Sequence, residues 1–448
     1  MTSPRRFPRA LLLLAPLWAC TTDPTSAPRT LAPDEPSLAI SAGTPTDRYL
    51  VQLAPGAASV TASIASVGAA VQRSVPALGL YEVSGLDDAG AQSLRARSEI
   101  VAVARDMRQQ FVPAFSGARV QSTPGPRPLG SDQSGAFFYP VQWNMHRIQA
   151  QAGWAATPGG AGALVCVLDT GVDPGQADLL GKVDLGKSAS MVPSEPFIED
   201  LHFHGTYVSS LVSSNGIGMA SVAPDAQLCA VKVLDANGSG NFFDLIGGIV
   251  HAADVGADVI NMSLRGFVDL SDPNGAALFQ LLGDAARYAR QKGTLLLAAT
   301  GNDALNIDQI EPFRVIPAQT PGVTGITATK QGLEGTEAIA PYSNVGNTVT
   351  DITAPGGDFN PSNQFDFVLG ACSRYVCGAD NFYLLASGTS AASPHVAGVA
   401  ALAESFKAGN QNEDQLRACL ARGAEKLRRP PRSAQGLGRI NALLTGVC

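Results

Sequence analysis

The 448-residue sequence is poor in charged and aromatic side chains, and each shortage bears on what the protein can be. Charged residues make up 15% of the chain, aromatic residues 6%, and the net charge is −7. An acidic balance argues against nucleic acid as a partner. Beyond the N-terminus no apolar run reaches the about 20 residues that a transmembrane helix needs. Hydrophobic residues, at 45%, are enough for a sizeable core.

Cysteine is also scarce, with seven residues and no Cys-x-x-Cys pair. The missing pair argues against a zinc ribbon or a redox motif. Six cysteines lie in the body of the chain, an even number that suits disulfides in an oxidising compartment. Their connectivity stays open, but the spacing favours two short-range pairs, and the remaining two lie in apolar, strand-like segments that suit buried thiols. The two short-range pairs would be Cys372 with Cys377 and Cys419 with Cys448. The two cysteines that suit buried thiols are Cys166 and Cys229.

Residues 1–19 have the features of an export signal. Arg5 and Arg6 precede a short apolar run that ends at Cys20. The sequence Leu-Trp-Ala-Cys resembles the lipobox of bacterial lipoproteins, which implies that Cys20 is lipidated and becomes the mature N-terminus. The alternative is a plain secretory signal cut after a small residue such as Ala19. Either reading predicts export from a bacterial cell, to the envelope or the medium.

The residues after the signal divide into a spacer, a small unit and a linker. Residues 20–47 are rich in Thr, Ser, Pro and Ala and predict a flexible spacer. Residues 48–112 predict a small α+β, ferredoxin-like unit, and residues 113–137 an exposed linker open to proteolysis. Within the small unit we expect strands at 49–53, 79–83 and 100–103 and helices at 58–70 and 87–97.

From residue 138 to residue 448, apolar strand-like runs alternate with helical patterns. The clearest runs are residues 163–168, 228–234, 259–263, 294–300 and 323–329. This alternation predicts an α/β fold in which a mostly parallel central sheet is covered by helices on both faces. In such sheets the functional groups gather at the carboxyl ends of the strands.

Three polar residues beside glycines stand out as candidates for nucleophilic catalysis. Asp169 ends an apolar strand and could orient a histidine. His204 opens a helical stretch and is a natural general base near neutral pH. Ser390 lies at a helix start, where backbone N–H groups can face developing negative charge. His202 with His204 could also be two metal ligands, but no acidic or cysteine partner has suitable spacing, so we predict no metal site.

The motifs Asp-Thr-Gly, His-Gly-Thr and Gly-Thr-Ser-x-x-x-Pro-His, which contain Asp169, His204 and Ser390 in that order, resemble the three signatures of the subtilisin-like serine protease family. The Gly-x-Ser-x-Gly motif of α/β-hydrolases is absent. The resemblance implies a subtilisin-like fold and a serine endopeptidase that forms an acyl-enzyme. It also likens residues 48–112 to the family's inhibitory prodomain, removed by self-cleavage in the linker.

Two further segments resemble functional parts of this family. Ala-Ala-Thr-Gly-Asn302 implies that Asn302 is the side-chain donor of the oxyanion hole, although an Asn there could also simply cap a loop. Ser263, Leu264, Arg265 and Gly266 resemble the edge that pairs with extended substrate. The family usually has glycine where this chain has Arg265. That side chain could narrow the cleft, favour acidic substrate residues, or point to solvent.

The expected partners are protein or peptide substrates and, as inhibitor, the protein's own prodomain. We expect contact with a membrane through a lipid anchor alone, a monomer, and no required cofactor. A structural calcium ion is left open and unassigned, because residues 213–218 are shorter than the loop that holds calcium in many relatives. Two rival functions are a catalytically silent surface binding protein that keeps the fold and an esterase that uses the same site.

Overall fold

The structure is a computed structural model that describes residues 40–56, 60–113, 118–122, 130–332, 336–359, 366–379, 382–409 and 411–448. The predicted signal, the lipidation candidate Cys20 and most of the spacer lie outside these ranges. Among the described residues, no helix combines the length and the apolar character needed to span a membrane.

A mostly parallel sheet lies at the centre of residues 138–448, as predicted. Its strand order is β15-β14-β12-β10-β6-β8-β7, with β16 beside β14. Strand β15 is antiparallel to β14, whereas the other pairs are parallel. All five predicted strands are confirmed, as β6, β8, β10, β12 and β14. The bounds are β6 Leu164–Asp169, β7 Ala189–Ser190, β8 Gln227–Lys232, β10 Val259–Met262, β12 Leu295–Ala299, β14 Val323–Gln331, β15 Glu337–Ile339 and β16 Ile352–Pro355.

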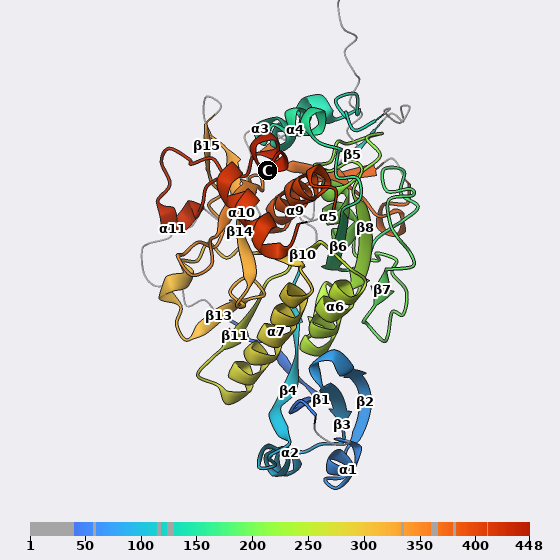
Figure 1. The fold of residues 1–448 in the computed structure, drawn as a ribbon, viewed down its shortest axis with the longest axis vertical. Helices are drawn as coiled ribbons and strands as arrows, with labels where there is room; N and C mark the ends of the chain where they lie inside the picture. Colours follow the sequence, from blue (N-terminus) through green and yellow to red (C-terminus); the bar gives the residue numbers. More distant parts are fainter. Residues whose placement is uncertain are drawn as a thin grey trace, which may run out of the picture. The chain divides into compact units, whose positions relative to one another are not determined.

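Helices cover both faces of this sheet (Figure 1). Ala230 of β8 belongs to the core cluster that contains much of α9. Its neighbour Val231 points to the opposite face, as successive strand residues do, and lies against Gly248 of α6. The helices packed on the sheet are α5 His204–Val212, α6 Phe242–Asp254, α7 Pro273–Gln291 and α9 Thr389–Phe406.

Shorter elements surround this framework. A small sheet has the order β17-β18-β5, and β11 pairs with β13. The prediction of an exposed linker at residues 113–137 missed strand β5. This strand forms because its backbone pairs with β18. The bounds are β5 Ala118–Gln121, β11 Gly266–Asp269, β13 Phe313–Ile316, β17 Val368–Ala371, β18 Phe382–Ala386, η2 Tyr139–Val141, α3 Trp143–Arg147, α4 Ala150–Ala156, η3 Ile307–Gln309, α8 Arg374–Cys377, α10 Glu413–Gly423, α11 Arg432–Gln435 and α12 Ala442–Gly446.

The cysteines pair more fully than the sequence suggested. The two short-range disulfides are confirmed, Cys372 with Cys377 and Cys419 with Cys448. The prediction of two buried thiols was wrong, because Cys166 and Cys229 also form a disulfide. They lie directly opposite each other in the parallel pair β6–β8, a register that the sequence alone does not reveal.

Residues 44–110 form what we call the small sheet unit. Its strand order is β2-β3-β1-β4, with every neighbour antiparallel and two helices between strands, which is the predicted ferredoxin-like arrangement. The prediction missed β2, because the helix expected to reach residue 70 ends at Ala65 and the chain turns at Gly68, with φ +75°. The bounds are β1 Thr44–Leu53, α1 Val60–Ala65, β2 Ala70–Val75, η1 Pro76–Leu78, β3 Leu80–Ser84, α2 Asp88–Arg95 and β4 Ile100–Gln110.

Strand β4 joins the small sheet unit to the main fold. It pairs with β9 (Ser239–Asn241), so the sheet continues across the boundary. Figure 1 shows β1 to β4 beneath the lower ends of α6 and α7. Asp106 of β4 accepts a hydrogen bond from the first N–H of α6, that of Phe242 (3.0 Å). Near the start of α7, the Asn274 side chain bonds both the N–H and the carbonyl of Arg105 (2.6 and 3.0 Å).

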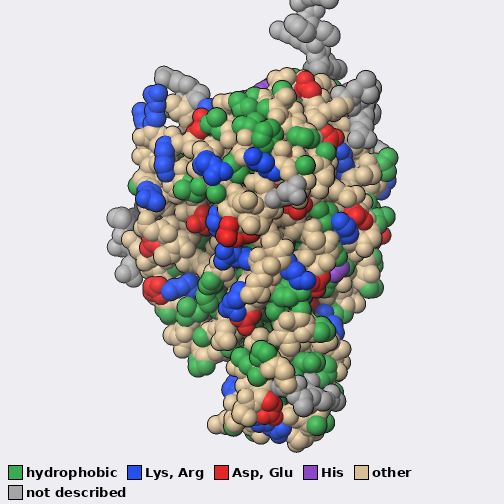
Figure 2. All heavy atoms as spheres, viewed as in Figure 1, with side chains coloured by type: hydrophobic (Ala, Val, Ile, Leu, Met, Phe, Trp, Pro, Cys, Tyr) green, Lys and Arg blue, Asp and Glu red, His purple; other side chains and the backbone are tan. Residues whose placement is uncertain are grey.

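The face of the molecule in Figure 2 carries both signs of charge interspersed over the elements. Beneath the surface, however, three carboxyl groups gather where β4 meets α6. Arg73 bridges Glu82 and Asp244 (2.8 and 2.7 Å). Asp106 lies beside them, fully buried, and its second oxygen has no hydrogen-bond partner among the described residues. Burial, reinforced by the charge of Asp244, raises the pKa of Asp106 to about 8.

We expect this cluster to make stability fall as the pH rises. The pKa of Asp106 lies above its ordinary 3.8 in the folded protein, so folding retains a proton that unfolding releases between 3.8 and about 8. Burial also raises the pKa of Asp244, to about 6, which acts in the same direction. Asp106→Asn keeps the oxygen that accepts from Phe242 and should flatten this slope. Urea unfolding of the Ser390→Ala protein across this pH window measures it.

The matched control is Asp47→Asn, at an exposed aspartate of the small sheet unit that pairs with Arg48. It should leave the slope as it is in the parent protein. A parent protein whose stability is flat or rising over this window would contradict the expected titration of Asp106.

Candidate active site

The predicted acid and base of the site come together at the carboxyl edge of the central sheet. Asp169 is the last residue of β6 and His204 the first residue of α5. His204 Nδ1 lies 2.8 and 2.9 Å from the two carboxylate oxygens of Asp169. Both side chains are buried. With a proton on Nδ1 directed at the carboxylate, the Nε2 lone pair is left to accept a proton.

Two glycines allow the segments that carry these residues to approach. Gly171 has a φ of +105°, which favours glycine. A Cβ at Gly205 would collide with the carbonyl oxygen of Gly171. The Asp-Thr-Gly and His-Gly-Thr motifs therefore touch backbone to backbone, which explains why each needs its glycine.

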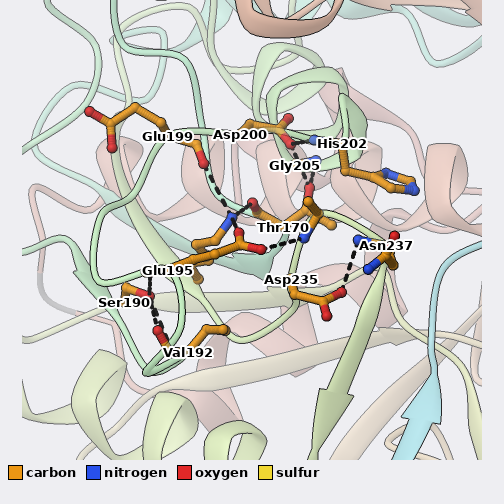
Figure 3. A network of polar contacts seen from close by, with 12 residues as sticks. Thr170, Ser190, Val192, Glu195, Glu199, Asp200, His202, Gly205, Asp235 and Asn237 are labelled. Atoms are coloured by element: carbon orange, nitrogen blue, oxygen red, sulfur yellow. Dashed lines mark hydrogen bonds and ion pairs between the residues drawn. The ribbon is translucent and has the colours of Figure 1, made fainter.

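Asp200 fixes the start of α5 and so the position of the histidine. Its buried carboxylate accepts hydrogen bonds from the Thr170 hydroxyl (2.8 Å), the Phe203 N–H (2.9 Å) and the Thr206 N–H (2.8 Å). The same Thr170 hydroxyl accepts from the Gly205 N–H (2.9 Å), and Figure 3 shows Thr170 beside Asp200 and Gly205. Phe203, just before the histidine, has a φ of +108°, a strained conformation held by these contacts. The sequence reasoning did not identify Asp200.

Lys232 supports the same region from below, and the sequence reasoning missed it too. Its side chain is fully buried, and Nζ donates to the carbonyls of Thr170 (2.6 Å) and Glu199 (3.2 Å). It also forms an ion pair with Glu195 (2.8 Å). Thr170, Glu195 and Glu199 surround this point in Figure 3. A lysine within an apolar strand is the signal that could have revealed it, because a buried charge needs partners.

Ser390 lies in the first turn of α9, after Gly388 with its φ of +154°. Its hydroxyl donates to the Ser263 carbonyl (3.1 Å), and the Ser263 hydroxyl donates to the Ser390 carbonyl (3.0 Å). The candidate nucleophile therefore lies against the segment predicted to bind substrate, Ser263 to Gly266. The hydrogen bond from Ser390 to His204 that catalysis needs stays a prediction.

Asn302 lies close to the start of α9. Its Oδ1 accepts from the N–H and the hydroxyl of Thr389 (both 2.9 Å). These two bonds fix the orientation of the amide. Its Nδ2 faces Gly388, since a Cβ added to Gly388 would lie 3.1 Å from Nδ2. An amide held in this way can donate to an oxyanion formed beside Ser390.

The chain that follows β4, residues 111–113, occupies a groove in the main fold; we call it the tail. The N–H groups of Phe111 and Val112 both donate to the Gly238 carbonyl (3.0 and 3.1 Å). On the other side, the Arg265 N–H donates to the Phe111 carbonyl (3.3 Å). The tail thus lies between the Gly238 segment and the predicted substrate-binding segment, and it bonds both through backbone atoms.

The tail runs antiparallel to the predicted substrate-binding segment. Two residues before Phe111, the Gln109 side chain bonds the N–H and carbonyl of Phe267 (3.0 and 2.8 Å), two residues after Arg265. Extending this register by two residues would place Pro113 level with Ser263, next to the candidate nucleophile. A peptide held as the tail is would therefore present a carbonyl to Ser390 close to residue 113.

The loop at residues 213–218, which the sequence analysis found shorter than the calcium-binding loop of many relatives, is held by the side chain of Asp178. The buried carboxylate of Asp178 accepts from the N–H groups of residues 217, 218 and 219 (2.7, 3.0 and 3.2 Å) and from the Tyr383 hydroxyl (2.7 Å). Among the described residues no cluster of three or more His, Cys, Asp or Glu side chains suits a metal. Calcium binding stays open.

Residues 160–438 match the sequence model described as the Subtilase family. The chain belongs to this family of subtilisin-like serine proteases. It is 32% identical to thermitase of Thermoactinomyces vulgaris, over 68% of this chain and 96% of that one. It is 33% identical to a thermophilic serine proteinase of Bacillus sp. (strain AK1), over 65% of this chain and 63% of the relative.

Solved structures show the same subtilase fold. The epidermin leader peptide processing serine protease EpiP of Staphylococcus aureus superposes with a TM-score of 0.73 at 21% identity, covering 89% of this chain and 97% of that one. A lanthipeptide protease gives a TM-score of 0.60 at 24% identity, covering 73% of this chain and 98% of the other. The predicted fold class is thereby confirmed.

We expect Lys232→Met to destabilise this subtilase. Methionine fills similar space but leaves the buried carbonyl oxygen of Thr170 and the partly buried one of Glu199 without their donor, at about 1–3 kcal/mol for a buried group. Urea unfolding of the Ser390→Ala form measures the loss, and kcat of the active form should fall because Thr170 adjoins Asp169. The control Lys292→Met removes a half-exposed pair with Asp254 and should cost at most about 1 kcal/mol. Equal losses for both variants would contradict the role given to Lys232.

Proposed function

We propose that this subtilase is a serine endopeptidase that uses Asp169, His204 and Ser390 as a catalytic triad. The observation that carries the proposal is the buried His204 imidazole held by the Asp169 carboxylate at 2.8 Å, together with a predicted substrate-binding segment that already bonds the backbone of the tail. The proximity of Ser390 to the wall of that groove supports its role as nucleophile.

The proposed reaction is acyl transfer. Ser390 Oγ attacks the peptide carbonyl carbon while His204 Nε2 takes the hydroxyl proton, and Asp169 stabilises the imidazolium. The oxyanion receives hydrogen bonds from the Ser390 N–H and the Asn302 amide. The C–N bond then breaks, and His204 returns the proton to the leaving amine. Water, deprotonated by His204, attacks the acyl-enzyme ester and releases the acid and the free serine.

Substrate backbone would bind in the place of the tail. Gly238 offers a carbonyl on one side and Arg265 an N–H on the other, both of which now bond the tail. Such backbone pairing holds any extended peptide, whatever its sequence. This supports an endopeptidase acting on protein or peptide chains.

The small sheet unit with its tail would serve as inhibitory prodomain of a zymogen. Its tail fills the groove that substrate needs, and β4 is fixed by β9 and by the starts of α6 and α7. We propose self-cleavage just after the tail, within residues 113–118. If Cys20 is lipidated, this cut leaves the lipid on the prodomain and releases the enzyme from the envelope.

We expect a fluorophosphonate probe to label the active protein at Ser390, because the probe reacts with an activated serine hydroxyl. Ser390→Ala should abolish labelling, casein hydrolysis and self-cleavage together. N-terminal sequencing of the mature parent protein should give a start within residues 114–118. The neighbouring Ser393→Ala serves as serine control and should still be labelled. An alanine variant at residue 390 that matures in purified form would refute self-cleavage.

The two rival functions give different results. A catalytically silent binding protein would resist the probe and leave casein intact even after the prodomain is removed. An esterase would react with the probe and hydrolyse esters but not matched amides.

We expect Asn302→Ala to lower kcat by about 10²–10³ with little change in KM, because the amide would donate to the oxyanion and not to bound substrate. Steady-state kinetics on a peptide amide measure both constants. Asn306→Ala, which removes the cap of the nearby η3, is the matched control and should retain kcat. A loss confined to KM would assign Asn302 to substrate binding.

A further inference from the structure

The loops after β10 and β12 form two facing walls beside the candidate nucleophile. These strands are parallel neighbours, with Met262 opposite Ala298. The loop after β10 bonds Ser390 through Ser263, and the loop after β12 carries Asn302. In the proposed reaction, the peptide carbonyl lies between Ser390 and Asn302. The side chain on the acyl side of the cleaved bond, called P1, must therefore enter the space between these loops.

Arg265 crosses from the first loop to the second. Its guanidinium forms an ion pair with Asp303, the residue after Asn302. Its Cγ packs directly against Gly301, because a Cβ added to Gly301 would lie only 2.6 Å from the Arg265 Cγ. The guanidinium also lies over the Phe267 ring, 5.0 Å from its centre. The side chain is 33% exposed and paired, which argues against the alternative that it points to solvent.

Asp303 is itself held in place by hydrogen bonds, so the Arg265–Asp303 ion pair is anchored on both loops. The Asn344 amide donates to the second carboxylate oxygen of Asp303 (2.9 Å), and the Asn344 Oδ1 accepts the Asp303 N–H (3.1 Å). The Asp303 side chain is only 13% exposed. A carboxylate held in this way neutralises Arg265, which leaves the guanidinium little attraction for an acidic substrate.

We propose that the Arg265–Asp303 ion pair closes the pocket for P1 to large side chains, so that the enzyme cuts after small residues such as alanine. This rests on the proposed endopeptidase function and adds the class of substrate. The pair joins the two walls of the space that P1 must enter. A wide aromatic side chain would have to break the pair or displace Arg265 from Gly301.

The tail independently supports a narrow pocket. The residue that the extended register would place level with Ser263 is Pro113, which follows Val112 and precedes Ala114 in the sequence. All three are compact. A cut after Val112, Pro113 or Ala114 would present a compact residue to the pocket, whereas a cut after Phe115 would not, so a mature protein that starts at residue 116 would contradict the pocket proposal.

The test compares matched peptide amides that differ at P1, alanine against phenylalanine. The mature parent enzyme should prefer alanine in kcat/KM. Arg265→Ala should raise the ratio of phenylalanine to alanine by roughly tenfold or more, the range in which a pocket discriminates side-chain size. Asp303→Asn keeps the side-chain volume but removes the charge, and should raise the ratio by a smaller factor. Arg287→Ala removes an exposed ion pair on α7 and should leave the ratio unchanged.

Three results would overturn the proposal. The parent enzyme could prefer phenylalanine, it could prefer aspartate or glutamate at P1, or neither pocket variant could change the ratio. In each case fluorophosphonate labelling and alanine-peptide hydrolysis by the parent show that the proposed function stands while the pocket proposal fails. A parent protein that is not labelled and cleaves no peptide refutes both.

Discussion

Parallel neighbouring strands deliver their following residues to one edge of a sheet, and the whole candidate site depends on this constraint. Strands β6, β10 and β12 are adjacent and parallel, so Asp169, Ser263 and Asn302 emerge side by side although they are far apart in sequence. Helices on the two faces supply the remaining groups, because α5 begins with His204 and α9 begins next to Ser390. The chemistry needs no element outside this one edge.

Burial of polar groups gives this edge its precision. Asp200 and Lys232 lie out of solvent, and their charged groups bond backbone N–H and carbonyl groups of the segments that carry Asp169 and His204. Such groups are costly when unpaired, so a displaced loop would leave them unsatisfied. The segments are thereby fixed before substrate arrives, which is how an enzyme avoids reorganisation during the reaction.

Most of the strands and helices could be predicted from the sequence, because each of them follows from the pattern of neighbouring residues. Buried strands such as β10 and β12 are continuous apolar runs. The candidate catalytic residues lie in short family motifs, each of which also contains a glycine. What failed depended on pairing in space. The Cys166–Cys229 disulfide follows from strand register, β5 from a partner strand more than 250 residues later, and the supporting role of Lys232 from carbonyls on two loops. Local periodicity contains none of these distances.

Recognition by the groove and selection by the pocket are physically separate. Gly238 and Arg265 bond the tail through backbone atoms alone, so this contact gives affinity without reading side chains. Selectivity must then come from the space that a side chain enters, and the same Arg265 that pairs with the backbone sends its side chain across that space to Asp303. One residue thus serves both purposes through different atoms. Because self-cleavage would use the same groove, the residues after β4 have to satisfy the pocket as well, and a compact Val-Pro-Ala sequence at that point is what this double demand selects.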